Sequence, residues 1–226
     1  MRNRSKPPHL PAAAAPGGTP SPAPTGLRRS PRRVRRSLAL IALLAATLVT
    51  APTAAVAASA PGARAALAQK RLDITMQSQQ KNNWCWAAGG NTIATWFGRN
   101  YSQNQFCNAA FNRQQGTECP NDQATLGNVQ NGLRWAGINS GSYVTGWLRY
   151  ATVQSEINAG RPVETRIQWS SGGGHMHVIY GYDDANSLVY WGDPWPSSDR
   201  YNWASHDWYV GNNSFSWTHS LYRIGA

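Results

Sequence analysis

Acidic side chains are scarce in this sequence, and residues 1–57 contain none. The whole chain has 21 Lys and Arg against ten Asp and Glu, which gives a formal net charge of +11. Nine of the basic residues lie in residues 1–57, whereas residues 58–226 hold twelve basic and ten acidic residues, or about +2. A part this close to neutral lacks the basic footprint of a nucleic-acid-binding domain, so we expect no nucleic-acid partner.

The sequence also lacks an apolar run long enough to cross a membrane, which takes about 20 residues. An uncharged apolar run covers residues 38–51, after six arginines between residues 28 and 36 and before an A-x-A pattern at residues 55–57. This order is typical of a secretory signal peptide. We therefore predict a signal peptide with a disordered basic n-region over residues 1–57, and a secreted protein that meets a membrane only through this peptide. A membrane anchor is the alternative interpretation of the same residues.

Residues 58–226 are too few for a large multidomain enzyme, since one domain takes roughly 150 residues. Aromatic residues make up 11% of the chain, which excludes a disordered protein without a core. We predict a short N-terminal extension over residues 58–73 and one monomeric domain over residues 74–226.

Hydrophobic periodicity divides this domain into a helical first half and a β-rich second half. Apolar residues at helical spacing predict helices over residues 84–97, 103–112, 124–137 and 152–159. Alternating or turn-bounded apolar residues predict strands over residues 163–169, 174–182, 188–191 and 216–224. Helices that precede strands in this way indicate an α+β fold.

The chain has only three cysteines, and an odd number leaves at least one thiol outside an internal disulfide. Cys107 and Cys119 lie twelve residues apart in a loop-like stretch, which favours a disulfide between them. Cys85 then remains free, at the start of the first predicted helix. The positive end of a helix favours a thiolate, so Cys85 is a candidate nucleophile. A buried thiol that acts only as a small hydrophobic group is the alternative.

A candidate base and its partner lie on two strands that a turn over residues 183–187 joins. If these strands pair, His175 and Asp193 come within reach of each other. A thiolate needs such a base, and the base needs a polar partner that orients its ring. His177 is the alternative base and Asn186 an alternative partner. The pair His175 and His177 could also bind zinc with a carboxylate, but a full ligand set is missing.

Two sequence stretches carry a resemblance to a known family. The first reads Gln-Gln-Lys-Asn-Asn-Trp-Cys-Trp-Ala-Ala over residues 79–88. The second comprises Ala-Gly-Arg-Pro-Val over residues 159–163, followed by Gly-His at 174–175, Gly-Tyr at 181–182 and Asp-Pro at 193–194. Both resemble motifs of papain-like cysteine peptidases, in particular a bacterial branch with bacteriocin-leader peptidase domains and a plant-pathogen effector protease. The two glycines at positions 89 and 90 depart from that pattern, since glycine disfavours a helix interior.

The resemblance implies a papain-like fold, in which an N-terminal helical subdomain packs on an antiparallel β-sheet. It also implies a triad of Cys85, His175 and Asp193, without a cofactor or a metal. The side-chain amide of Gln79, six residues before the cysteine, would supply a donor to the oxyanion. Gln80 is the alternative in a register shifted by one residue.

We therefore expect a secreted cysteine peptidase that hydrolyses proteins or peptides through an acyl-enzyme intermediate. The same triad could serve a cysteine acyltransferase or a cell-wall peptide hydrolase. A catalytically inactive binding module on the same scaffold is the non-enzymatic alternative. Five tryptophans in the C-terminal third could pack in the core, which we favour, or form a stacking platform for a ligand: Trp191, Trp195, Trp203, Trp208 and Trp217.

Overall fold

The computed structural model of the chain describes residues 68–226, so the predicted signal peptide lies outside the described residues. Within residues 68–226, no helix has both the length and the apolar character that crossing a bilayer demands. These residues combine one antiparallel sheet with five helices, which confirms the predicted α+β class.

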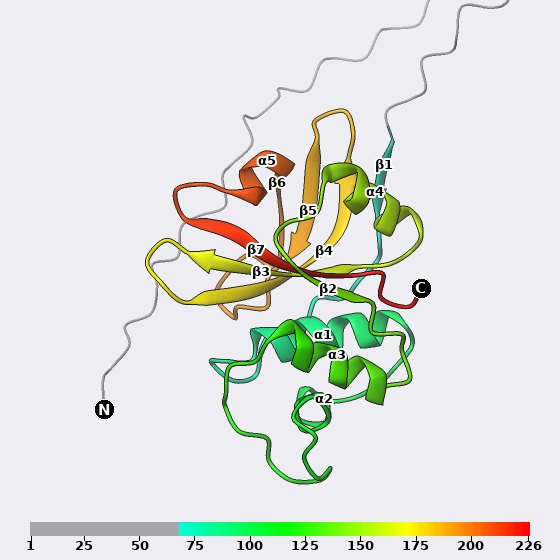
Figure 1. The fold of residues 1–226 in the computed structure, drawn as a ribbon, viewed down its shortest axis with the longest axis vertical. Helices are drawn as coiled ribbons and strands as arrows, with labels where there is room; N and C mark the ends of the chain where they lie inside the picture. The colour runs from blue at the N-terminus through cyan, green and yellow to red at the C-terminus, as the bar shows by residue number, and fades with distance from the viewer. Residues whose placement is uncertain (1–67) are drawn as a thin grey trace, which may run out of the picture. The chain divides into compact units, whose positions relative to one another are not determined.

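The sheet forms one side of the domain (Figure 1). Its strands follow the order β2-β7-β3-β4-β5-β6, and β1 pairs with β4 outside this path. All the pairs are antiparallel. The strands are β1 (Gln69–Arg71), β2 (Ser142–Thr145), β3 (Val163–Trp169), β4 (Gly174–Asp183), β5 (Leu188–Gly192), β6 (Tyr201–Ser205) and β7 (Phe215–Tyr222).

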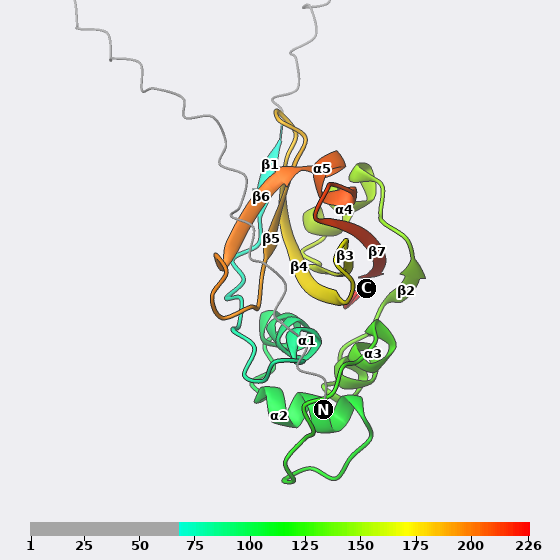
Figure 2. The same ribbon diagram turned by 90° about the vertical axis from the view of Figure 1, so that its left-hand side faces the viewer.

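Three of the helices form a layer beside the sheet, as both ribbon views show (Figures 1 and 2). These are α1 (Cys85–Trp96), α2 (Gln103–Ala110) and α3 (Leu126–Trp135). The other two, α4 (Tyr150–Asn158) and α5 (His206–Val210), lie away from this layer. The arrangement agrees with the expected helical subdomain on an antiparallel sheet.

The two glycines of α1 are explained by close packing on both sides of the helix. A Cβ atom on Gly89 would lie 2.7 Å from Oε1 of Glu164, and one on Gly90 would lie 2.6 Å from the ring of Phe106. Phe106 belongs to α2 and is fully buried. Because these contacts leave no room for a side chain, glycine lets α1 approach both the sheet and α2, at a cost of about 1 kcal/mol each in helix propensity.

Strand β4 is the centre of the sheet and changes its neighbour along its length. Its first half pairs with β3, from Gly174 to Ile179, and its last residues pair with β1. Strand β5 covers its other edge from residue 178 to residue 183. Residues 175–182 are all buried, since the sheet is covered on both faces here. A side chain on the first half of β4 is therefore held rigidly beneath α1.

The predicted helices and the predicted strands are all present, with ends shifted by a few residues. Strands β1, β2 and β6 and helix α5 were not predicted. Strand β1 pairs with β4, and Leu72 is buried in the core. The sheet and the core therefore begin before residue 74, which is the predicted start of the domain. That boundary stays a prediction.

Candidate active site

Cys85 is the first residue of α1, where the aromatic residues on either side of it anchor the helix end. Trp84 and Trp86 are both almost fully buried. Their indole N–H groups donate to the carbonyl oxygens of Pro120 and Asp122, at 2.9 and 3.0 Å. The loop over residues 120–122 therefore fixes the start of α1, and with it the position of the thiol.

This loop is closed by the predicted disulfide. Cys107 and Cys119 form a bond of 2.13 Å, and both residues are fully buried. Cys85 is the free cysteine of the described residues and is half-buried. The disulfide ties the loop to α2, while the remaining thiol stays at the border between the helical layer and the sheet.

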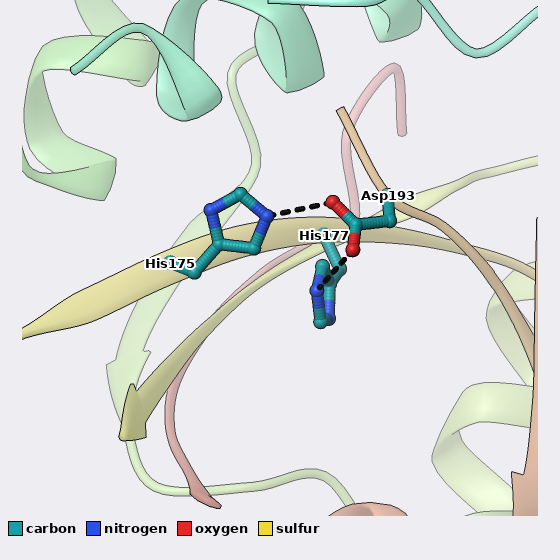
Figure 3. A group of neighbouring side chains, drawn as sticks. All are labelled: His175, His177 and Asp193. Atoms are coloured by element: carbon teal, nitrogen blue, oxygen red, sulfur yellow. Dashed lines mark hydrogen bonds and ion pairs between the residues drawn. The ribbon is translucent and has the colours of Figure 1, made fainter. Parts of the chain in front are cut away.

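His175 and Asp193 form the predicted pair. Nε2 of His175 lies 2.7 Å from Oδ1 of Asp193, as Figure 3 shows. His175 is the second residue of β4, and Asp193 follows the end of β5. The alternative partner, Asn186, is exposed in the turn between the strands, where it donates to Asp183 at 3.2 Å.

The second ring nitrogen of His175 is turned away from Asp193 (Figure 3). Cys85 also interacts electrostatically with His175 and raises the pKa of the imidazole, and Nδ1 is the ring nitrogen that Asp193 leaves open. The structure thus brings Cys85, His175 and Asp193 together in this order, from three separate elements.

The electrostatics of this group favour a charged imidazole. Burial alone would lower the pKa of His175, but the hydrogen bonds and charges of Asp193 and Cys85 outweigh burial and raise this pKa to about 10. Burial would raise the pKa of Asp193, whereas the hydrogen bond and charge of His175 hold it well below its ordinary value. At neutral pH the pair is therefore an imidazolium next to a carboxylate.

Two tryptophans enclose the His175 ring. Trp169 stacks on it with the ring centroids 6.1 Å apart, and Trp195 meets it edge-on at 6.3 Å. The backbone N–H of Trp195 also donates to Oδ1 of Asp193 at 2.8 Å. The pair is thus shielded from solvent on both sides, which strengthens its hydrogen bond.

Gln79 is buried in the loop before α1, and its neighbour Gln80 is exposed. The backbone N–H of Gln79 donates to the carbonyl of Pro194 at 2.8 Å, which links this loop to the residue after Asp193. Its side-chain Nε2 donates to the carbonyls of Lys81 and Asn82, both at 2.9 Å. In this state the amide hydrogens of Gln79 are engaged within the loop, so donation to a substrate requires the exchange of one of these bonds.

A hollow of about 220 Å³ lies next to Gln79. The loop before α1 forms one wall of it, and the segment after Pro194 forms the other. Its lining residues are Gln79, Gln80, Lys81, Asn82, Trp195, Pro196 and Ser197.

His177, the alternative base, lies deeper than His175 and is 3% exposed. Its Nε2 is 3.7 Å from Oδ2 of Asp193 (Figure 3). Ligand atoms of His175, His177 and Asp193 lie within 4.8 Å of one another, so by distance the three could hold a metal ion. A metal there would replace the hydrogen bond of 2.7 Å between His175 and Asp193, and would compete with the pair.

Glu164 is a buried carboxyl that the sequence analysis did not single out. It is fully buried on β3, close to Cys85 and Gly89, and neither of its oxygens has a hydrogen-bond partner. Burial, and then the charge of Cys85, raise its pKa well above the ordinary value. Alternating polar and apolar residues predicted strand β3, but the local sequence did not show that α1 covers the face of β3 that carries Glu164.

The C-terminal tryptophans divide into core and surface residues. Trp191 and Trp217 are 6% and 2% exposed, which supports core packing for these two. Trp208 stacks on Trp191, with ring centroids 6.2 Å apart. Trp203 is 47% exposed on β6, and Trp195 lies against His175 as described above.

Three solved structures of bacterial peptidases are similar to the chain at low sequence identity. The peptidase domain of Streptococcus ComA, a bifunctional ABC transporter involved in quorum sensing, is 16% identical, with a TM-score of 0.46, over 68% of this chain and 97% of that one. A double-glycine-motif protease from an AMS/PCAT transporter, solved with its leader peptide, is 15% identical, with a TM-score of 0.43, over 68% and 93%. Xylellain, a cysteine protease from Xylella fastidiosa, is 11% identical, with a TM-score of 0.46, over 70% and 87%.

Sequence comparison gives the family. No curated protein matches the chain. The model of a family described as papain-like cysteine protease AvrRpt2 matches residues 68–214, which include Gln79, Cys85, His175 and Asp193. This confirms the family resemblance found in the sequence, and the chain belongs to the AvrRpt2 family of papain-like cysteine proteases.

Proposed function

We propose that this cysteine peptidase hydrolyses peptide bonds with Cys85 as nucleophile, His175 as general base and acid, and Asp193 as the group that orients His175. One observation carries the proposal. His175 is held between Asp193 and Cys85, and these two neighbours raise its pKa to about 10 despite its burial. A histidine that stays protonated at neutral pH stabilises a thiolate beside it, and the thiolate is the nucleophilic form of cysteine.

The chemistry follows from this ion pair. The Cys85 thiolate attacks the carbonyl carbon of the scissile bond, and the carbonyl oxygen becomes a tetrahedral oxyanion. His175 gives its Nδ1 proton to the departing amine, which leaves a thioester on Cys85. His175, now neutral, takes a proton from water, and the resulting hydroxide attacks the thioester carbon. The acid product and the Cys85 thiolate are released, which restores the ion pair. Asp193 keeps Nε2 of His175 occupied, so that Nδ1 always faces the sulfur.

Gln79 is the proposed side-chain donor to the oxyanion, together with the backbone N–H of Cys85. The Gln79 amide lies at the start of the nucleophile loop and is tied to Pro194 through its backbone. The oxyanion would replace one of the two loop carbonyls that now accept from Nε2. Loss of such a donor typically costs about 10²–10³-fold in kcat.

We also propose that the protein is exported and acts on protein or peptide substrates as a monomer. The basic and apolar order of residues 1–57 supports export, and so does the buried disulfide, since such bonds persist in oxidising compartments. The hollow beside Gln79 and Trp195 has room for part of a peptide chain next to the proposed oxyanion donor.

The rate of Cys85 alkylation by iodoacetamide against pH tests this proposal. We expect fast alkylation already at about pH 6, whereas an ordinary thiol reacts only near pH 8.5. In the variant His175→Ala, Cys85 should react like an ordinary thiol. The variant Cys85→Ala should not react with iodoacetamide. His219→Ala is the matched control, because His219 is a half-buried histidine on β7 that bonds to Thr218.

An alkylation profile that rises only near pH 8.5 and is the same in His175→Ala would refute the ion pair. It would favour an inactive binding module on the peptidase scaffold. Hydrolysis of a peptide library, followed by mass spectrometry, then gives the cleavage specificity of the active protein.

A further inference from the structure

A second histidine of β4, His177, has no part in the mechanism above. It is 3% exposed and packs between the rings of Trp191 and Tyr209, with ring centroids 6.1 and 6.0 Å away. Phe215 lies edge-on to it at 6.4 Å. His177 is therefore enclosed in the core of the sheet and does not reach a substrate.

Both ring nitrogens of His177 face polar groups. Nδ1 lies 3.1 Å from the hydroxyl of Tyr209, and this hydroxyl lies 2.6 Å from Oγ1 of Thr165. Nε2 has no hydrogen-bond partner among the described residues, but it lies 3.7 Å from Oδ2 of Asp193. A chain of polar groups thus runs from Thr165 through Tyr209 and His177 to the carboxylate that binds His175.

The charge of the His177 ring decides which of these polar groups donate hydrogen bonds. Burial and the positive charge of His175 outweigh the attraction of Asp193 and lower the pKa of His177 to about 3, so its ring is neutral. The titratable groups that face it are His175, Asp193 and Tyr209, and burial keeps the Tyr209 hydroxyl protonated by raising its pKa. A neutral imidazole carries one proton, which can sit on either nitrogen.

The contact with Asp193 favours one tautomer of His177. A proton on Nδ1 would leave the lone pair of Nε2 pointing at the Asp193 carboxylate, in a buried and repulsive contact. A proton on Nε2 faces the carboxylate instead, at an N···O distance of 3.7 Å, which is an electrostatic attraction and not a hydrogen bond. Nδ1 then accepts from the Tyr209 hydroxyl, and that hydroxyl accepts from Thr165, whose Oγ1 also lies 3.5 Å from the carbonyl oxygen of His177. Each O–H and N–H of the chain then points in the same direction, toward Asp193.

We propose that His177 is a positioning residue, which holds the carboxylate of Asp193 in place through its Nε2–H, and that Tyr209 and Thr165 fix the tautomer that does so. The inference rests on the proposed triad. Oδ1 of Asp193 is bound by His175 and by the backbone N–H of Trp195, whereas Oδ2 faces His177. A carboxylate attracted at both oxygens keeps its plane, so the hydrogen bond to His175 keeps its direction.

Variants at His177 and Tyr209 test the proposal in the full chain. His177→Phe keeps an aromatic ring but removes the donor, and we expect kcat to fall about 10- to 100-fold with little change in KM, the range seen for residues that orient the ligands of a catalytic metal. The alkaline limb of kcat/KM, which reports deprotonation of His175, should move to lower pH. His177→Gln restores an N–H donor and should recover part of both effects.

Tyr209→Phe provides a second test that preserves the packing of the core. It removes the hydroxyl that accepts from Thr165 and donates to Nδ1, so the tautomer of His177 is no longer fixed. We expect a smaller loss of kcat and a smaller shift of the alkaline limb than in His177→Phe. Urea unfolding of each variant measures stability separately, because a purely structural role would lower the unfolding midpoint without moving the pH limb.

Two results separate this proposal from the triad on which it rests. If Asp193→Ala leaves the alkaline limb and kcat unchanged, the triad itself is wrong. If Asp193→Ala has a large effect, while His177→Phe and Tyr209→Phe change neither kcat nor the alkaline limb, the triad stands and the positioning role of His177 is refuted. In the double variant Asp193→Ala/His177→Phe, the effect of His177 should disappear, because its target is absent.

Discussion

Two carboxyl groups at the candidate site, one partly buried and one fully buried, have opposite surroundings. Asp193 accepts hydrogen bonds from His175 and from a backbone N–H, and its side chain is 13% exposed. Glu164 is fully buried on β3 and has no hydrogen-bond partner at either oxygen. The pKa of Asp193 is held well below its ordinary value, and that of Glu164 is raised well above it.

The comparison shows that burial alone does not decide the charge of a carboxyl group. Burial favours the neutral form in both residues, but only Asp193 has a cation and N–H donors that reverse this preference. Asp193 is thus a carboxylate that supports an imidazolium. In Glu164, burial favours the neutral acid, a form that adds no negative charge beside Cys85.

The largest expected effect comes from removing the partnered carboxylate. Asp193→Ala should lower kcat/KM about 10²–10⁴-fold, because His175 loses the group that orients and charges it. Steady-state hydrolysis of a peptide substrate measures this effect. A loss of less than tenfold in a folded variant would mean that His175 is held by its two flanking tryptophans and does not need Asp193.

The contact between Glu164 and α1 gives the second prediction. Gly89→Ala would place a Cβ atom 2.7 Å from Oε1 of Glu164, and overpacking of this kind costs about 1–3 kcal/mol in the free energy of unfolding. Urea unfolding measures the cost. Gly127→Ala in α3 is the control, since its nearest neighbour would be 3.3 Å away, at Oγ1 of Thr125. If the two variants were equally stable, Glu164 could move aside freely.

The third prediction concerns the pH dependence of stability. The pKa of Glu164 is higher in the folded chain than in the unfolded one, so the folded state binds more protons once the pH exceeds about 4.5. The free energy of unfolding therefore falls as the pH rises above this value. Glu164→Gln should remove the share of this pH dependence that comes from Glu164. Urea unfolding at a series of pH values measures it.

His175 contributes a second slope to the plot of the free energy of unfolding against pH. This slope depends on Asp193 and not on Glu164. The pKa of His175 rises from 6.5 to about 10 on folding, so its stabilisation is complete below pH 6.5 and is lost as the pH rises toward 10. This slope should persist in Glu164→Gln and weaken in Asp193→Ala. If Glu164→Gln kept the full wild-type slope between pH 4.5 and 6.5, Glu164 would be ionised in the folded protein.

The smallest expected effect is that of Glu164→Gln on activity. An amide has the same shape as a neutral carboxylic acid, so Cys85 meets no change in charge. We expect kcat/KM to change by less than about threefold, or roughly 0.6 kcal/mol in the activation free energy. A larger change in kcat/KM at unchanged stability would mean that Glu164 influences the ionisation of the Cys85 thiol.

The three residues of the proposed triad could be brought together from the sequence because each lies in a motif with a local signal. Cys85 begins a helix, and a short turn joins the strands that carry His175 and Asp193. Glu164 had no such signal, since whether its side of β3 is covered depends on α1, far away in the sequence. The partner of His177 was equally hidden, because Tyr209 lies 32 residues further along the chain in a short helix that periodicity did not show.

The edge strands were missed for a related reason. Strand β2 has four residues and β6 has five, and both alternate between exposed and less exposed positions without a continuous apolar face. Strand β1 has only three residues, and its pairing with the last residues of β4 is a long-range contact. Such strands form because a neighbour offers free backbone groups, which no local pattern records.

The positions of the sulfur atoms bear on how the protein must be handled. Cys85 is half-buried and free, whereas the cystine that closes the loop beneath Trp84 and Trp86 is fully buried. Oxidation of an accessible thiol to a sulfenic acid or a mixed disulfide is reversed by a thiol reductant, which needs access to the sulfur. A mild reductant can therefore keep the proposed nucleophile active in storage and in assays, while the crosslink that anchors its helix stays intact.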